Sequence, residues 1–208
     1  AGGERGTVVR TGERWGAVVG GGGRCGSRWG AMFRLSQGPW TAGVAERSRC
    51  EEVIDDLALD RPSDFIGGGP AWANISEGAL KLREAAHVQA EGHQLENFLH
   101  GPLISVEAGQ TVFVIAEPGP GLDRTIEISR ALTMIGTRLV GVGSGSDQLD
   151  GVPASIAIHR LPEVLAPIAN VILLQWIAYL AAARRGVDPD VLRADESAYA
   201  HAIKSLQL

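Results

Sequence analysis

Acid–base side chains gather in one stretch of the sequence, EGALKLREAAHVQAEGHQLENFLHGP at positions 77–102. Glu77, Lys81, Glu84 and Val88 follow one another at spacings of four, three and four, which places them on one face of a helix. Carboxylate, amine and imidazole groups are the side chains that most often transfer protons in catalysis. The same spacing is also typical of a solvated helix face, where each Glu–Lys pair contributes a few tenths of a kcal/mol. Spacing alone favours the solvated face over a catalytic site.

His100 follows this stretch and precedes Gly101 and Pro102. A lone histidine at such a place usually caps or packs, although the proline restricts the turn that carries it. A second set of residues, Ile75, Ala79, Leu82 and Ala86, recurs at helical spacing and is expected to pack on a sheet. The pattern predicts one long helix over residues 71–91.

Other segments alternate between apolar strands and helices. CEEVIDDLALDRP has helical spacing, DFIGGG is typical of a buried strand that enters a glycine turn, and TVFVIAE, GLDRTIEISRALTMIG, RLVGVGS and SIAIHR follow as strand, helix, strand, strand. The order predicts an α/β fold, a three-layer αβα sandwich of flavodoxin-like type with a mainly parallel sheet. Ligands of such sheets bind beyond the carboxyl ends of the strands, where GGGPAW, the loop after VIAE and hence Gly68 and Gly69 are expected.

Composition limits the possible functions. With 208 residues, 45% apolar residues and a net charge of −5, the chain predicts one ordinary core and no nucleic-acid or anionic-membrane surface. Cys25 and Cys50 form no CxxC pair, which indicates a reducing, cytoplasmic compartment and no thiol nucleophile. The sequence begins with Ala1 and has no charged-then-apolar leader, so no signal peptide is expected. The five histidines lack the usual metal-ligand spacings, and neither a metal nor a cofactor is expected.

The first 50 residues differ from the rest, because Gly, Arg and Trp dominate them and hydrophobic periodicity is weak. We expect an irregular or non-native N-terminal segment over residues 1–50 and one folded domain over residues 51–208. Gly21, Gly23 and Gly26 match GxGxxG, but further glycines and a proline interrupt the helix that a dinucleotide site needs. Chance in a glycine-rich run explains the match better.

The segment VLAPIANVILLQWIAYLAAA, residues 164–183, has the length and apolarity of a membrane span. Pro167, Asn170 and Gln175 interrupt it, and a basic RRG follows. These features favour a helix buried in a globular core, and no membrane partner is expected.

Three motifs together carry a family resemblance: EGALKLRE at 77–84, AE at 90–91 and HGP at 100–102. In type, order and spacing they resemble the second sugar isomerase (SIS) domain of the glutamine:fructose-6-phosphate aminotransferases, also called glucosamine-6-phosphate synthases. The apolar segment with its sequel GVDPD and the final AIKS resemble the same domain, so the likeness covers residues 51–208. It implies a phosphosugar-binding domain, the isomerase half of such an enzyme, paired with a second SIS domain or as a homodimer.

The resemblance also implies roles for individual residues. Glu84 matches the base that moves a proton between C1 and C2 of an open-chain sugar phosphate, and Lys81 matches a lysine that stabilises charge on oxygen. His100 matches the histidine of ring opening, which that family supplies across a subunit interface. Lys204 matches a lysine that engages the sugar carbonyl. Gly68, Gly69 and Glu77 are the expected substrate-binding residues, and fructose-6-phosphate or glucosamine-6-phosphate is the expected class of ligand.

Departures from the family pattern leave alternatives open. ENFL stands at 96–99 where the synthases have GELK, and the serine-rich phosphate cradle of the family's first SIS domain is missing. GSGSDQ at 143–148 could cradle a phosphate, but a plain turn is favoured. A non-catalytic sugar-phosphate-binding module and a deglycase of phosphorylated fructosamines therefore remain alternatives, and we expect the isolated chain to be weakly active or inactive.

Overall fold

The structure is a computed structural model that describes residues 46–157 and 160–206. In this part of the chain five parallel strands form one sheet in the order β2-β1-β3-β4-β5. The strands are β1 (Ser63–Gly67), β2 (Ala90–Gln94), β3 (Thr111–Ile115), β4 (Arg138–Val142) and β5 (Ala154–Ile156). The chain leaves β1 toward β2 on one side and returns to β3 on the other, so a topological switch point lies between β1 and β3.

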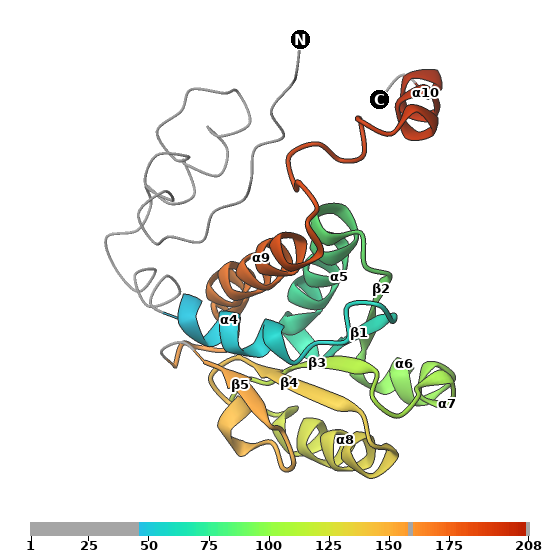
Figure 1. Ribbon diagram of the computed structural model, residues 1–208. Helices are drawn as coiled ribbons and strands as arrows, with labels where there is room; N and C mark the ends of the chain where they lie inside the picture. Colours follow the sequence, from blue (N-terminus) through green and yellow to red (C-terminus); the bar gives the residue numbers. More distant parts are fainter. Residues whose placement is uncertain (1–45, 158–159, 207–208) are drawn as a thin grey trace. The chain divides into compact units, whose positions relative to one another are not determined.

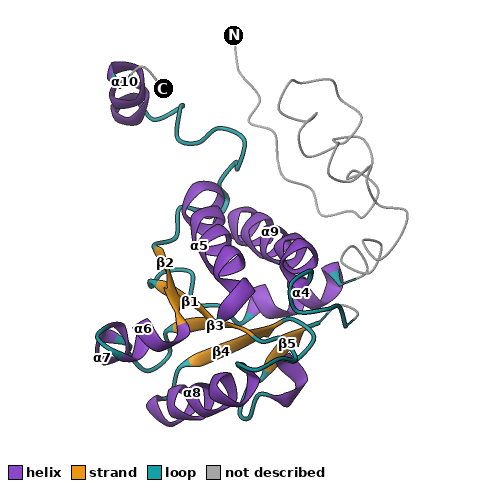
Figure 2. Ribbon diagram, turned by 180° about the vertical axis from the view of Figure 1, so that it is seen from behind, coloured by secondary structure: helices purple, strands orange, loops and turns teal. Residues whose placement is uncertain are grey.

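Helices cover both faces of this sheet (Figures 1 and 2). One layer holds α4 (Arg47–Asp55), α5 (Trp72–Ala86) and α9 (Ala166–Arg185), and the other holds α6 (Leu95–Leu99), α7 (Pro102–Ser105) and α8 (Leu122–Ile135). Two short 3₁₀ turns, η1 (Gly69–Ala71) and η2 (Ser146–Gln148), and the helix α10 (Ser197–Ser205) complete the described elements. The predicted three-layer parallel sandwich is confirmed.

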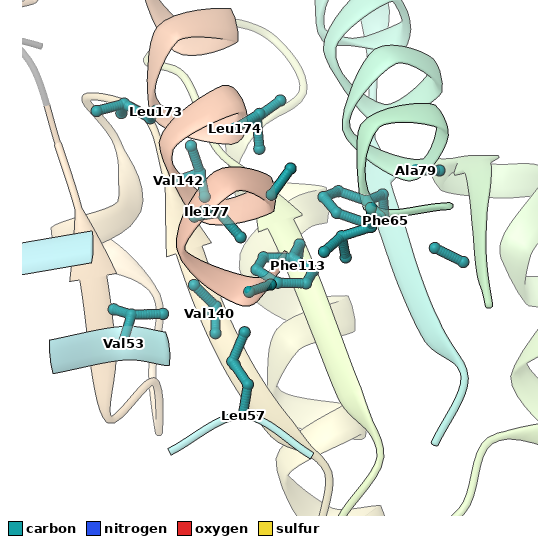
Figure 3. Close-up of a cluster of buried hydrophobic side chains, with 14 of the residues drawn as sticks. Val53, Leu57, Phe65, Ala79, Phe113, Val140, Val142, Leu173, Leu174 and Ile177 are labelled. Atoms are coloured by element: carbon teal, nitrogen blue, oxygen red, sulfur yellow. The ribbon is translucent and has the colours of Figure 1, made fainter. Parts of the chain in front are cut away.

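The larger core lies between the sheet and the layer of α4, α5 and α9. Phe65 of β1 and Phe113 of β3 stack there with ring centroids 4.3 Å apart, and Leu174 and Ile177 of α9 pack with them (Figure 3). Gly78 of α5 lets this helix approach closely, since a Cβ at that position would lie 2.7 Å from the ring of Phe65. The helix that carries the acid–base residues is thus fixed against the centre of the sheet.

Helix α5 is shorter than the prediction of residues 71–91. It ends at Ala86, and His87 adopts a left-handed conformation with φ of 53°. The segment from Ala90 to Gln94 then forms the edge strand β2, where Gly92 passes so close to α5 that a Cβ would lie 2.9 Å from the carbonyl oxygen of Ile75. The predicted sheet-facing set is buried as expected. Val88 is buried and lies beyond the helix, so its expected place on the outer helix face is wrong.

Helix α9 contains most of the segment that resembles a membrane span. Of the helices described, α9 is long and apolar enough for a span, with a mean hydropathy of 1.6. Its buried residues belong to the larger core, which explains the apolar run without a bilayer.

The helix α4 begins at Arg47 and buries Cys50 completely. Burial, with smaller contributions from Glu46 and Glu51, raises the pKa of the Cys50 thiol to about 12, which suits a core residue and not a nucleophile. The boundary at residue 50 stays a prediction. The GxGxxG match and Cys25 lie outside the described residues.

Candidate functional site

The acid–base cluster that the spacing predicts forms on the outer face of α5. The ammonium Nζ of Lys81 lies 2.7 Å from Oε2 of Glu84 and 3.7 Å from Oε1 of Glu77. The Lys81 side chain is 23% exposed and that of Glu84 is 44% exposed. The structure therefore brings three predicted site residues together on a helix face that is open to solvent.

His100 lies on a turn between two short helices. It is the C-cap of α6, its N–H donates to the carbonyl of Asn97, and its side chain is exposed. The preceding helix is held to α8 by Arg124, which donates to both carboxylate oxygens of Glu96 at 2.8 and 3.2 Å. This hydrogen bond is the main reason that the pKa of Glu96 lies below its usual value. Glu96 is thus committed to a structural ion pair.

Lys204 lies on α10, a helix without a buried residue, and its side chain is exposed. No hydrogen bond or ion pair within residues 46–157 and 160–206 joins Lys204 or His100 to Lys81 or Glu84. Of the four predicted catalytic residues, only Lys81 and Glu84 are in contact, and the roles of all four stay predictions.

A small pocket opens elsewhere, at the switch point beyond the carboxyl ends of β1 and β3. Its polar side chains are Asn74, Glu117, Thr125 and Glu163, and its other lining residues are Gly68, Ala71, Ile115, Gly121 and Pro167. Gly69 borders the same space, because a Cβ there would lie 3.4 Å from Oε1 of Glu163. Both predicted substrate-binding glycines are therefore at the pocket, whereas Glu77 is on the α5 face.

The pocket is separate from the acid–base cluster. Asn74 and Glu84 are ten residues apart on α5, which corresponds to about 15 Å along a helix axis. Glu84, Lys81, His100 and Lys204 do not line this pocket. The predicted catalytic groups and this pocket therefore lie at different places in the described part of the domain.

Glu117 organises the loops around the pocket. Its carboxylate accepts hydrogen bonds from the backbone N–H and the hydroxyl of Ser144, at 3.2 and 2.5 Å, and from Nδ2 of Asn170 at 2.7 Å. Gly143 has a φ of +108° and leaves room for this carboxylate, which a Cβ there would meet at 2.3 Å. The GSGS segment is therefore a turn bonded to an acidic side chain, as favoured from the sequence, and this arrangement opposes a phosphate at the same place.

Sequence reasoning placed a ligand site at this edge of the sheet but missed Asn74, Glu117 and Glu163. Glu117 is the last residue of VIAE, so its place directly after a buried strand was a usable signal. Asn74 and Glu163 are distant in sequence and meet only through the topology. Among the residues described, no group of three or more His, Cys, Asp or Glu side chains could hold a metal ion.

Comparisons with known proteins agree with this architecture. No protein-family model matches the sequence. The isomerizing glutamine:fructose-6-phosphate aminotransferase of Methanothermobacter thermautotrophicus is 37% identical over 152 residues, which is 71% of this chain and 25% of that protein. The corresponding enzyme of Pyrobaculum aerophilum is 34% identical over 152 residues, 72% of this chain and 24% of that protein. The chain thus spans about a quarter of these relatives.

Solved structures show the same fold. The C-terminal domain of the aminotransferase from Francisella tularensis superposes with a TM-score of 0.67 at 20% identity, over 78% of this chain and 46% of that one. The tagatose-6-phosphate ketose/aldose isomerase of Escherichia coli superposes with a TM-score of 0.59 at 18% identity, over 70% of this chain and 44% of that one. The parallel sheet, its switch-point pocket and these likenesses define a domain of the SIS class.

The chain therefore belongs to the SIS family. Within that family it is homologous to part of the isomerizing glutamine:fructose-6-phosphate aminotransferases.

Proposed function

We propose that this chain is a phosphosugar-binding SIS domain that supplies the isomerase half of an aminotransferase-like enzyme. Glu84 is the base that moves a proton between C1 and C2 of an open-chain sugar phosphate of the fructose-6-phosphate or glucosamine-6-phosphate class. An aldose–ketose interconversion needs one base that reaches both carbons, and a carboxylate on a rigid helix suits this task. The observation that carries the proposal is the 2.7 Å contact of Lys81 with Glu84 on a face that packing leaves free for a ligand.

Lys81 complements this base. In the proposal, its ammonium neutralises part of the negative charge that develops on the sugar oxygen as the proton leaves carbon. His100 opens the sugar ring and Lys204 engages the carbonyl in the same proposal. Each needs a further surface to approach Glu84, because the structure does not place either beside it.

A second SIS domain, or a second copy of the chain, completes the site in this proposal. Glu84 is 44% exposed, and a base of this kind works best when the reaction excludes water. Exposed apolar side chains also occur on the helices of this layer, since Trp72 and Leu80 of α5 and Ile168 of α9 are 50%, 41% and 51% exposed, which is compatible with a partner that covers this layer. The structural relatives named above are about twice as long as the matched region, which leaves room for a second domain in each. A cytoplasmic location is part of the proposal.

The test is exchange in deuterated water of a C1 proton of fructose-6-phosphate and of the C2 proton of glucosamine-6-phosphate, followed by NMR together with calorimetric binding. Glu84→Gln keeps the size of the side chain and removes the base, so exchange should fall by about 10²–10⁴-fold while binding is kept. Glu107→Gln is the matched control, because Glu107 is exposed and precedes the opposite end of β3.

Either of two results would contradict the proposal. Exchange that survives in Glu84→Gln would assign the base to another residue. Binding without exchange in the unmodified chain, also in the presence of a complementing SIS domain, would favour the non-catalytic sugar-phosphate-binding module.

A further inference from the structure

The pocket at the switch point has an unusual balance of hydrogen-bonding groups. The carbonyl of Pro167 accepts one N–H of Asn74 Nδ2 and the carbonyl of Gly121 accepts the hydroxyl of Thr125, both at 2.9 Å. The second N–H of Asn74 is the one side-chain donor among the described lining residues that these bonds leave over. What the lining side chains still offer is therefore mainly acceptors, which favours a ligand that brings donors.

Asn74 supplies the acceptor that most needs a partner. The residue is 2% exposed, and its Oδ1 has no hydrogen-bond partner although it is buried. An unpaired buried carbonyl oxygen costs about 1–3 kcal/mol of free energy. Because Asn74 lines the pocket, a donor bound there removes this cost.

Glu163 supplies the second acceptor. Its carboxylate lies against Gly119, where a Cβ would be 2.6 Å from Oε2. It makes no hydrogen bond or ion pair with any residue in the described ranges, and it lines the same pocket as Asn74. A carboxylate in this state is available to a cation.

The electrostatics of the pocket agree with a positive ligand. The N-termini of α5, α8 and α9 lie at the pocket through Ala71, Gly121 and Pro167. Each helix N-terminus carries about half a positive charge, which makes about 1.5 charges in total against the two carboxylates of Glu117 and Glu163. Lys, Arg and His do not occur among the described lining residues, so the two carboxylates are the full charges that these residues bring to the pocket, and they oppose a phosphate.

We propose that this pocket binds an ammonium group, either the ammonium ion or the protonated primary amine of a small ligand, held by Glu163 and Oδ1 of Asn74. A primary ammonium fits because it is small, cationic and carries three or four N–H donors. This site is separate from Lys81 and Glu84 and does not depend on them, although Gly68 and Gly69, which the sequence predicts as substrate-binding residues, lie at it.

The first experiment measures thermal unfolding of the purified chain in ammonium, potassium and tetramethylammonium chloride at equal ionic strength. Ammonium should raise the melting temperature above the other two salts, since potassium brings no N–H donors and tetramethylammonium has none either. In Glu163→Gln the apparent Kd for ammonium should rise by about tenfold, as expected for the loss of one charge-assisted hydrogen bond. Glu107→Gln removes the same charge far from the pocket and should keep the response.

The source of the ammonium group is distinguished by two further ligands, methylammonium chloride and D-glucosamine, with D-glucose as the matched compound that has no amine. A response to methylammonium and glucosamine identifies an amine ligand, and a response to ammonium alone identifies the free ion. Isotope-labelled ¹⁵NH₄⁺ gives a direct readout, because a bound ion shows a proton–nitrogen signal that is protected from exchange with water.

The proposal is wrong if potassium or tetramethylammonium stabilises the chain as well as ammonium does, or if Glu163→Gln leaves the ammonium response intact. Glu84→Gln should keep this response. A failure of the phosphosugar proposal is therefore distinguishable from a failure of this one.

Discussion

The outer face of α5 and the switch-point pocket differ in how far their polar side chains are exposed and in how fully they are hydrogen-bonded. On α5, Lys81 and Glu84 form an ion pair on the outer face of the helix, where their side chains are 23% and 44% exposed. In the pocket, Glu117 is held by three donors, and the oxygens of Asn74 and Glu163 keep free lone pairs in a small space. Within one domain, the side chains predicted to react lie on an outer helix face, whereas other residues line the pocket.

This separation has a consequence for catalysis. An exposed ion pair between side chains contributes about 0–1 kcal/mol to stability, so stability does not explain why Lys81 and Glu84 are joined. In the proposed function, their role depends on a second surface that closes over them. The described lining of the pocket, by contrast, comes from several elements of this one domain.

The largest effect on stability is expected from Glu117→Gln. The amide that replaces one carboxylate oxygen is a donor, and it must face the hydroxyl of Ser144 or Nδ2 of Asn170, both of which also donate. At least one donor then loses its partner, and the free energy of unfolding should fall by about 1–3 kcal/mol. Urea unfolding followed by circular dichroism measures the change.

Glu163→Gln is the matched control for this variant, because Glu163 lines the same pocket without an internal partner among the described residues. It should change the free energy of unfolding by no more than about 0.5 kcal/mol. Equal losses in both variants would contradict the division of the pocket into a structural and a ligand-binding carboxylate.

Much of the framework could be predicted because its signals are local. The apolar strands β1, β3 and β4 are continuous runs, and helix α5 shows its buried set at a period near 3.6. The pairing of Lys81 with Glu84 follows from the same period. In these cases the residues that decide the structure are neighbours in sequence.

The rest depends on contacts between distant segments. Strand β2 has the sequence AEGHQ, which lacks an apolar run and contains a glycine, so neither composition nor periodicity indicates a strand. It forms because β1 offers a parallel edge and because Gly92 lets α5 approach. Asn74, Glu117 and Glu163 likewise meet only after the chain has crossed the sheet, and no local pattern could bring them together.

A smaller effect is expected from Gly78→Ala, which tests how tightly the α5 face is held. The added methyl group would lie 2.7 Å from the ring of Phe65, which is fixed by its stacking on Phe113. Overpacking of this kind costs about 1–3 kcal/mol, and the better helix propensity of alanine returns about 1 kcal/mol. The free energy of unfolding measured in urea should fall by about 1 kcal/mol. Exchange of the sugar proton that Glu84 removes in the proposed function should also be slower, because α5 must shift away from the sheet.

Ser76→Ala on the exposed side of the same helix separates the two contributions, because it improves helix propensity without touching the sheet. It should be neutral or slightly stabilising. A stabilising Gly78→Ala would mean that α5 has room to move, and that the geometry of Lys81 and Glu84 is not set by the core.

The smallest effect is expected at the end of α5, where His87 contacts the segment that leads to Lys204. Nε of Arg193 donates to Nδ1 of His87 at 3.2 Å, so the ring must be neutral on that nitrogen. Desolvation, then Arg193 and Arg185, lower the pKa of His87 below its ordinary 6.5, against the opposing influence of Glu196 and Asp195. The unfolded chain therefore binds a proton more readily than the folded one, and folding stability is lost as the pH falls below about 6.5.

His87→Asn should remove this part of the pH dependence, because asparagine tolerates the left-handed backbone and does not titrate in this range. The measurement is the difference in melting temperature between pH 7.5 and pH 5.5, which should shrink in His87→Asn and persist in His201→Asn, whose side chain is exposed on α10. An unchanged difference would show that the titration of His87 does not contribute to stability in this pH range. A reduced difference would tie the loss of stability at acidic pH to the protonation of a single ring at the end of the helix that carries Glu84.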